Sequence, residues 1–332
     1  MGVLRTPVLL SSATSSPFHN HRRTPKAWLP MPRADPIAKF RTLRSGLRLA
    51  ASVLAIVPIR DGASALDAPM YLGPKPPANV RRVVTLAPSL SETVIALGAA
   101  DRLVGVSRFD DFPEVSKLPR VGGFVDPSVE AVLALKPDLV LVQPSPGNRQ
   151  PVEKMAELGV PVLALRMQSV AQIIAGVREV GRALGLSDRA ESVAQSIERS
   201  RAAIRARSAG DKKVRVLFVY GLEPLVVAGP GSFADELMRD AGAVNAAQNV
   251  SSAYQTYSAE SAIRSRPEVV IVAADDSSGA EKLSRLPGLN QARWVKLQSK
   301  DLLHPGPSLS RGLEELFDLI HSTSLQHPPG SP

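Results

Sequence analysis

The strongest constraint on the fold is an internal repeat whose two copies lie 130 residues apart. Residues 128–142 read SVEAVLALKPDLVLV, and residues 258–272 read SAESAIRSRPEVVIV. Ser, Glu, Pro, the acid that follows Pro and a closing apolar run all recur at the same offset. Each copy predicts a short helix, a turn at Pro and a fully buried strand. Because this period is far longer than that of a solenoid, the sequence predicts two similar lobes rather than an array.

A long helix is predicted between the two copies, over residues 187–209. Ser187 has the side chain of a helix N-cap, and Gly210 can adopt the left-handed conformation that ends a helix. Acidic residues stand near the start of this stretch and basic residues near its end, as the helix dipole favours. About 22 residues at about 1.5 Å each give a rod of roughly 33 Å. We expect this backbone helix to join the two lobes.

The rest of the chain alternates short apolar strands with helices, one of them over residues 170–184. This alternation is typical of an α/β fold in which each lobe holds a mostly parallel sheet flanked by helices. Ser89 and Glu92 have the spacing of a capping box at the start of the first helix. Because ligands bind beyond the carboxyl ends of such strands, we expect a ligand cleft between the lobes. The predicted boundaries are 1–66 for a leader, 67–79 for a Pro-rich lead-in, 80–168 for the N-terminal lobe, 169–210 for the connecting helices, 211–307 for the C-terminal lobe, 308–322 for a final helix and 323–332 for a disordered tail.

The first 66 residues have the composition of a secretory leader. Residues 41–65 contain basic residues, then the apolar run 49–57, then small residues that predict cleavage after Ala65. A nine-residue apolar run is too short to span a bilayer as a helix. Met31 is an alternative start that would leave a leader of ordinary length. The sequence therefore predicts a protein of the bacterial periplasm.

The net charge of +9 belongs to the leader, not to the predicted lobes. Residues 1–66 hold ten Lys and Arg against two Asp and Glu, and residues 67–332 hold 30 against 29. A nearly neutral body gives no support for a nucleic-acid partner. The chain has no Cys, no phosphate-binding GxxxxGK[ST] loop and no GxSxG elbow, so we expect no disulfide, no thiolate metal site and no catalytic residues.

Five segments carry a family resemblance: RRVVTLAPSLSETVIALGA (81–99), SRFDDFP (107–113), VGGFVDPSVEAVLALKPDLVLV (121–142), the backbone helix and HPGP (304–307). Through them the sequence resembles the helical-backbone (class III) periplasmic substrate-binding proteins that serve ABC importers of cobalamin, haem and ferric siderophores, and the cobalamin-binding branch looks nearest. The resemblance covers about residues 80–320 and implies two lobes, limited hinge motion and no catalysis. It implies capture of a cobalamin-like corrinoid, or of haem or a ferric siderophore, by a monomer that delivers it to a permease dimer with its ATPase. A secreted α/β enzyme acting on a tetrapyrrole or chelate is the alternative of a different class.

The resemblance also implies that Glu130 and Glu260 dock the two lobes onto arginines of the permease. Both glutamates fall in the first turn of a predicted helix, at the same place in each copy of the repeat. The alternative is that each carboxylate only complements the dipole of its own helix. The pairing over 130 residues favours docking.

The predicted cleft loops concentrate the chain's few aromatic residues, namely Phe109, Phe124, Tyr220, Tyr254 and Tyr257. The cobalamin-binding branch carries aromatic residues at the positions of Phe109, Phe124 and Tyr254, although the first two are Tyr and Trp there. Aromatic faces suit a broad, partly apolar macrocycle. Asp301 matches an acid that reaches the corrin amides in that branch. Ordinary core packing is the alternative for the aromatic residues. It is the favoured interpretation for Phe112, and it stands level with ligand contact for Tyr220 and Tyr257.

His304 is the only histidine between residues 67 and 307, and it lies in a predicted cleft loop. It could bind the iron of haem or the cobalt of a corrinoid, or it could be an ordinary polar surface residue. A free zinc or manganese site needs several converging His and carboxylate ligands, which the positions of the five histidines do not offer. We therefore expect no bound metal and no prosthetic group apart from the transported ligand.

Overall fold

The computed structural model describes residues 68–273 and 277–322. The chain divides into two compact units, residues 1–62 and residues 63–332, and all that follows concerns the second. The predicted leader and the predicted tail at 323–332 lie outside the described residues.

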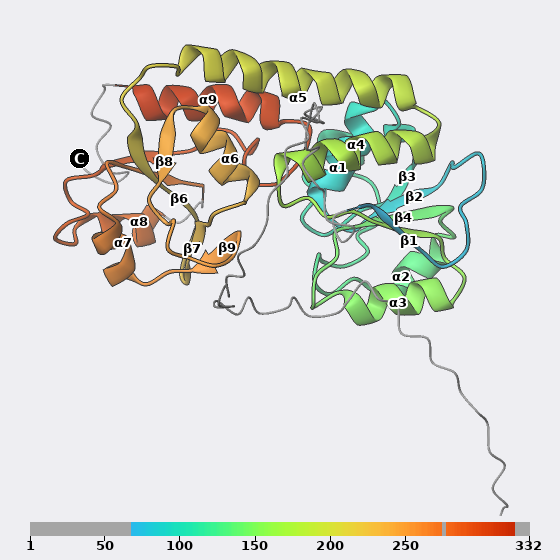
Figure 1. Cartoon of the computed structure of the whole chain (residues 1–332). Coiled ribbons are helices and arrows are strands. Elements are labelled where there is room, and N and C mark those ends of the chain that lie inside the picture. The colour runs from blue at the N-terminus through green and yellow to red at the C-terminus, as the bar shows by residue number, and fades with distance from the viewer. Residues whose placement is uncertain (1–67, 274–276, 323–332) are drawn as a thin grey trace, which may run out of the picture. The chain divides into compact units, whose positions relative to one another are not determined.

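The N-terminal lobe is built on a five-stranded sheet with the order β1-β5-β4-β2-β3 (Figure 1). All neighbouring strands in it are parallel except β1, which pairs with β5 in the antiparallel direction. β1 falls in the predicted Pro-rich lead-in, so that segment is not merely a linker but supplies an edge strand. The strands are β1 (Met70–Leu72), β2 (Val83–Thr85), β3 (Leu103–Gly105), β4 (Leu139–Val142) and β5 (Val162–Ala164).

The helices of this lobe show two ways of starting a helix. The side chain of Ser169 accepts from the backbone N–H of Gln172 and forms a full capping box for α4. The capping box predicted for Ser89 and Glu92 is wrong, because Pro88 begins α1 one residue earlier and Ala87, which has no side-chain acceptor, is the N-cap. The helices are α1 (Pro88–Ala96), α2 (Val129–Ala134), α3 (Arg149–Glu157) and α4 (Val170–Leu184), with short 3-10 turns η2 (Ala100–Arg102) and η3 (Pro113–Val115).

The C-terminal lobe has a six-stranded sheet with the order β11-β10-β6-β7-β9, and β8 also pairs with β6. β8, β6, β10 and β11 pair in parallel, whereas β7 and β9 add in the antiparallel direction, so this sheet is mixed. The strands are β6 (Val214–Leu222), β7 (Leu225–Ala228), β8 (Ala243–Asn245), β9 (Tyr254–Thr256), β10 (Val269–Val272) and β11 (Arg293–Lys296). The helices are α6 (Phe233–Asp240), α7 (Ala259–Ser265), α8 (Ser277–Ser284) and α9 (Leu309–His321).

The predicted backbone helix is α5 (Ser187–Arg207), which runs along both lobes and packs against α4 and α9 (Figure 1). Its buried residues are small or branched and follow the helical period, as expected for one apolar stripe. The predicted N-cap is wrong, because Ser187 is already helical and Leu186 precedes it without a side-chain hydrogen bond. The helix ends at Arg207, and Gly210 adopts its left-handed φ of 89° three residues later.

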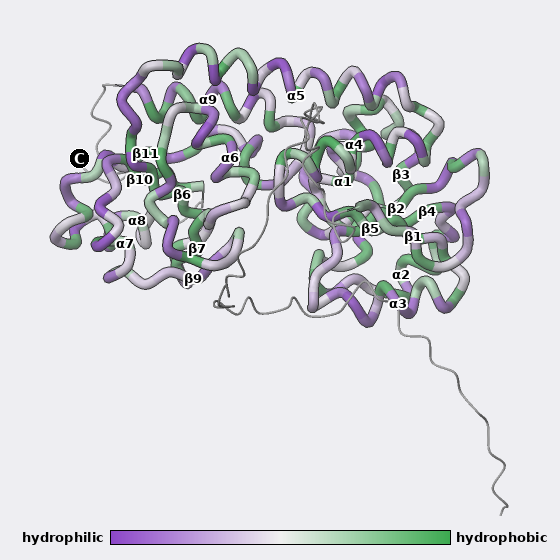
Figure 2. The backbone as a smooth tube through the Cα atoms, in the orientation of Figure 1, coloured by the Kyte–Doolittle hydropathy of each residue, from purple (hydrophilic) through white to green (hydrophobic). Residues whose placement is uncertain are grey.

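Each sheet is covered on both faces, and the two faces belong to different clusters of buried residues. Alternate strand residues such as Val83 and Val84 point to opposite faces and belong to different clusters. One cluster continues through both lobes and includes residues of α1, α4, α5, α6 and α9. The other face of each sheet packs on its own helices, α2 and α3 in the first lobe and α7 and α8 in the second. In Figure 2 the hydrophobic parts of the chain, drawn in green, gather in and around the two sheets. A shared core beneath the backbone helix therefore holds the lobes together.

The two copies of the repeat adopt the same local structure. In each copy the first serine caps a short helix: Ser128 Oγ accepts from Ala131 N–H at 3.2 Å, and Ser258 Oγ accepts from Ser261 N–H at 3.0 Å. Each helix is followed by a non-glycine residue in the left-handed region. These residues, Lys136 with φ 46° and Arg266 with φ 47°, are themselves 130 positions apart. The prediction of two matched helix-turn-strand units is confirmed.

Candidate functional site

Glu130 and Glu260 occupy equivalent places, each in the first turn of its repeat helix and each exposed. Their surroundings differ. The Glu130 carboxylate accepts a hydrogen bond from Ser128 Oγ at 3.3 Å, whereas Glu260 forms an ion pair with Arg264 one turn along α7. The geometry offers one carboxylate on each lobe, and the docking role remains a prediction.

A pocket of about 210 Å³ lies between the lobes. It brings Asp301 and His304 together, as predicted for cleft residues, and adds polar residues that the sequence did not single out. The N-terminal lobe contributes to its lining one residue of α1 and three residues of the segment that follows β3. The C-terminal lobe contributes residues of the 300–308 segment and one residue of α9. The lining residues are Glu92, Asp111, Phe112, Pro113, Lys300, Asp301, His304, Ser308 and Arg311.

Asp301 lies at the edge of the pocket with its side chain about 20% exposed. Arg311 of α9 holds the carboxylate in a two-pronged ion pair, with Nε 3.1 Å from Oδ2 and Nη2 2.9 Å from Oδ1. A carboxylate can accept about four hydrogen bonds. Asp301 can therefore stay oriented by Arg311 and still accept from an N–H group of a ligand.

His304 packs inside the pocket and is not the solvated surface histidine that was the alternative. Its ring makes an edge contact with Phe112 at a centroid distance of 6.4 Å. The Nδ1 atom is buried and has no hydrogen-bond partner among the described residues. Burial lowers the pKa of His304, against the opposing effect of Asp111, Asp110 and Asp301. The imidazole is therefore neutral at pH 7, the form that binds metals.

Glu92 is one of the pocket residues that sequence reasoning did not assign to the cleft. The backbone N–H of Ser308, at the start of α9, donates to Glu92 Oε1 at 2.5 Å. Glu92 is only 9% exposed, and its Oε2 atom is buried without a hydrogen-bond partner among the described residues. Burial raises the pKa of Glu92 to about 7. The signal that could have found it is Pro88, because a proline at the first helical position leaves Glu92 inside the helix.

Phe109 and Tyr254 are the most exposed large aromatic side chains in the described part of the chain, at 60% and 42%. Phe109 belongs to the loop after β3 in the N-terminal lobe, and Tyr254 begins β9 in the C-terminal lobe. The guanidinium of Arg108 lies 5.6 Å from the centroid of the Phe109 ring. Each lobe thus presents one open aromatic face.

Tyr220 and Phe124 are only partly exposed, and both pack against the shared core. The Tyr220 ring packs 4.9 Å from that of Phe218 and 5.3 Å from that of Tyr254, measured between centroids. Burial raises the pKa of Tyr220, and neighbouring Tyr254 adds to the rise. Phe124 packs against the shared core, and its backbone carbonyl accepts from Asn148 Nδ2 at 2.8 Å. The Tyr220 ring therefore packs behind the Tyr254 ring and does not itself present an open face to solvent.

Within residues 68–273 and 277–322, no three or more His, Cys, Asp or Glu side chains gather in a way that could hold a metal ion. None of the helices in those two ranges combines the length and apolar character needed to cross a membrane.

Comparison with known proteins is consistent with this architecture. A family model described as "Periplasmic binding protein" matches residues 83–296. The chain is 25% identical over 248 residues to a vitamin B12-binding protein of Vibrio parahaemolyticus serotype O3:K6, a match that covers 73% of this chain and 90% of that protein.

Two solved structures extend the comparison to three dimensions. A periplasmic heme-binding protein from Roseiflexus sp. RS-1 is 27% identical with a TM-score of 0.64, over 73% of this chain and 100% of that one. A periplasmic vitamin B12 binding protein of Vibrio cholerae is 20% identical with a TM-score of 0.64, over 73% and 96%, which shows a common fold. The family model spans well over half of the chain. The chain therefore belongs to the periplasmic binding protein family, in the class III form that has two α/β lobes joined by a backbone helix.

Proposed function

We propose that the protein captures a cobalamin-like corrinoid in the periplasm and delivers it to an ABC importer. The observation that carries this proposal is the pair of open aromatic side chains, Phe109 on one lobe and Tyr254 on the other. An exposed aromatic face is an apolar surface that a flat macrocycle can cover from each side. Stacking of this kind contributes roughly 0.5–1.5 kcal/mol per contact beyond the burial of area.

The polar pocket supports a ligand that carries amide groups at its edge. With about 210 Å³ it is smaller than the roughly 300–1,000 Å³ of pockets that enclose a drug-sized molecule. The macrocycle would therefore lie outside the pocket, and only a side group would enter it. Asp301 and Asp111 can accept from an amide N–H, and Lys300 can donate to an amide carbonyl.

Haem is the second candidate, and His304 is the residue that favours it. Its neutral imidazole lines the pocket, and neutral imidazole is the usual protein ligand of haem iron. The heme-binding relative from Roseiflexus is as similar to this chain as the vitamin B12-binding ones are. Ferric siderophores are the third ligand class that the family resemblance implies.

Delivery is assigned to Glu130 and Glu260 as docking residues for a permease dimer with its ATPase. Their equivalent positions on the two lobes suit a dimer whose two subunits present the same surface. A monomeric binding protein would then contact one permease subunit with each lobe. Export depends on the predicted leader with cleavage after Ala65, which lies outside the described residues.

Isothermal titration of the chain that begins at residue 66 tests the ligand. We expect one-to-one binding of cobalamin or cobinamide with a dissociation constant at or below about 1 µM, which corresponds to about −8 kcal/mol. Phe109→Ala should weaken it, whereas Leu158→Ala, which also removes an exposed apolar side chain, should not. Tighter binding of haemin, with an absorbance band lost in His304→Ala, would favour haem. Failure to bind cobalamin, cobinamide, haemin and ferric siderophores would contradict the proposal.

A further inference from the structure

Two glutamates occupy matching positions in the first helix of each lobe. Glu92 stands six residues before Gly98, which closes α1, and Glu236 stands six residues before Gly242, which closes α6. Both glycines adopt the left-handed conformation, with φ of 69° and 82°. The match is similar to that of the repeat but lies at a different offset.

Glu92 reaches from the N-terminal lobe to the C-terminal lobe. Its Oε1 accepts from the N–H of Ser308, directly before α9, and α9 packs against α5 and α6. The backbone of the preceding loop lies against the same carboxylate, because a Cβ placed at Gly306 would overlap Glu92 Oε2. A side chain at position 306 would overlap the Glu92 carboxylate, so that either the loop or the carboxylate would have to shift.

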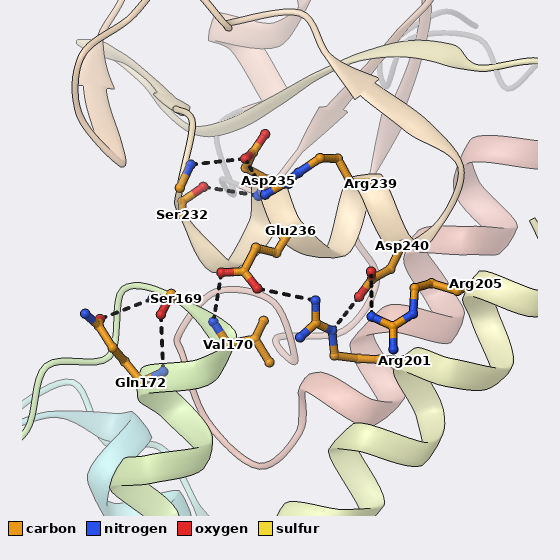
Figure 3. A network of polar contacts seen from close by, with 11 residues as sticks. Ser169, Val170, Gln172, Arg201, Arg205, Ser232, Asp235, Glu236, Arg239 and Asp240 are labelled. Atoms are coloured by element: carbon orange, nitrogen blue, oxygen red, sulfur yellow. Dashed lines mark hydrogen bonds and ion pairs between the residues drawn. The ribbon is translucent and has the colours of Figure 1, made fainter. Parts of the chain in front are cut away.

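Glu236 reaches in the opposite direction. Its Oε1 accepts at 3.2 Å from the N–H of Val170, the first residue of α4, and α4 packs against α1 (Figure 3). A backbone hydrogen bond reinforces the contact, since Phe233 N–H donates to Gln168 O at 2.6 Å. Each lobe therefore contributes one carboxylate, and this carboxylate accepts a backbone hydrogen bond at the start of a helix that packs on the other lobe.

We propose that Glu92 and Glu236 are positioning residues which form two reciprocal clasps, each fixing the N-terminus of a helix of the opposite lobe. The clasps hold the two sides of the cleft in register on the inner side of α5. The Glu92 clasp also orients the 301–308 loop, which carries Asp301 and His304. This last consequence for ligand binding rests on the proposed function, whereas the clasps themselves do not.

The two clasps differ in the charges that face them. Glu236 Oε2 pairs with Arg201 of α5 at 3.3 Å, and Arg239 and Asp240 of α6 stand nearby (Figure 3). Arg201 also forms an ion pair with Asp240, so the carboxylates and the guanidinium make one network. Burial raises the pKa of Glu236, but the Arg201 charge opposes the rise.

Glu92 lacks a direct cation. The charged side chains that share its pocket are Asp111, Lys300, Asp301 and Arg311, together with His304. Lys300 is paired with Asp111 and Arg311 with Asp301, so no cation of the pocket is paired with Glu92 in the described contacts. A carboxyl whose pKa lies above its unfolded value stabilises the folded state below the unfolded pKa, and this contribution is lost as the pH rises through the folded value. The Glu92 clasp therefore holds better at pH 6 than at pH 8, and the Glu236 clasp changes less.

Hydrogen exchange of two backbone amides tests the clasps without any ligand. We expect the Ser308 amide of the mature chain to exchange at least about tenfold faster in Glu92→Ala, and the Val170 amide to do so in Glu236→Ala, after correction for intrinsic rates. Glu157→Gln, which alters an exposed acid of α3, is the matched control and should change neither amide. Unchanged protection of Ser308 and Val170 in the alanine variants would overturn the proposal.

Glu92→Gln provides a second variant that retains an acceptor oxygen if the alanine variant does not fold. It should keep the protection of Ser308 but lose the dependence of that protection on pH between 6 and 8. A pH dependence that survives in Glu92→Gln would overturn the assignment of the asymmetry to Glu92. Titration of the same variants with the ligand then asks whether loss of the clasp weakens binding. A wild-type chain that binds no ligand would reject the proposed function, while the exchange rates would still decide about the clasps.

Discussion

The two lobes share one helix-turn-strand scaffold but are completed by different elements. In the N-terminal lobe, β1 enters from the lead-in and pairs with β5 at the sheet edge. In the C-terminal lobe, the antiparallel strands β7 and β9 extend the sheet instead, and β9 carries Tyr254. The common scaffold places Glu130 and Glu260 equivalently, whereas the open aromatic side chains come from unrelated segments. Under the proposed function, the symmetry suits contact with a permease dimer, and the differences suit an asymmetric ligand.

The largest effect should come from removing both matched acids. Glu130→Ala combined with Glu260→Ala should reduce uptake at least about 100-fold, because losing one partner of a docked charge pair costs about 2–5 kcal/mol and about 1.4 kcal/mol is tenfold. Ligand titration of the double variant should match the wild type. Of the single variants, Glu130→Ala should reduce uptake more, because Glu260 must give up part of its ion pair with Arg264 to dock. Loss of ligand binding in solution would show that these residues are not docking residues.

The contrast between the clasps predicts a dependence of stability on pH. The wild type should gain about 1–3 kcal/mol of unfolding free energy relative to Glu92→Gln as the pH falls from 8 to 5, since the pKa of Glu92 is raised to about 7. Relative to Glu236→Gln, the wild type should gain less unfolding free energy over the same pH range, because Arg201 compensates the Glu236 charge. Urea unfolding at several pH values measures both. A wild-type stability that falls toward pH 5 in parallel with that of Glu92→Gln would rule out this role for Glu92.

The acids after the repeat prolines differ in the number of backbone groups they bind. Asp138 Oδ2 accepts from the N–H groups of Arg81 and Arg82 at 2.7 and 2.9 Å. Glu268 Oε1 accepts only from that of Arg215, at 3.1 Å. Hydrogen bonds to charged groups contribute roughly 1.5–3 kcal/mol when buried and less when partly exposed. We expect Asp138→Ala to destabilise the protein by about 1–2 kcal/mol and Glu268→Ala by about half as much, measured by urea unfolding. Equal losses would argue against this difference between the lobes.

The smallest effect concerns the two aromatic faces taken singly. Phe109→Ala and Tyr254→Ala should each weaken ligand binding about three- to tenfold, in line with roughly 0.5–1.5 kcal/mol for one stacked contact. Titration calorimetry gives both constants, with Leu158→Ala as the control. An effect confined to one of the two variants would mean that only one lobe contacts the ring.

The parts of the fold that the sequence predicts well are those with local signals. Helix α4 has the predicted bounds because Ser169 and Gln172 form a capping box at its start and Gly185, with φ 68°, ends it. The repeat predicts α2, β4, α7 and β10 because each copy has its own capping serine and buried run. The backbone helix is found as well, although its first residue is not the cap.

The parts that sequence reasoning misses depend on contacts between distant segments. β1 has three residues and no periodic pattern, and it becomes a strand only because β5 offers an edge some 90 residues later. Glu92 has a plausible local role as a capping residue, but its partner is Ser308, more than 200 positions away. Asp301 and His304 are predicted for the pocket, whereas the aromatic packing of Tyr220 reflects neighbours in the tertiary structure.

A crystal structure of the mature chain bound to cobinamide or cobalamin tests the central claim most directly, because it shows which lobe contacts the ligand. The account predicts a single corrin ring held between Phe109 and Tyr254, with one amide side group entering the pocket beside Asp301. A ring bound to one lobe alone, or seated away from both aromatic side chains, would contradict it.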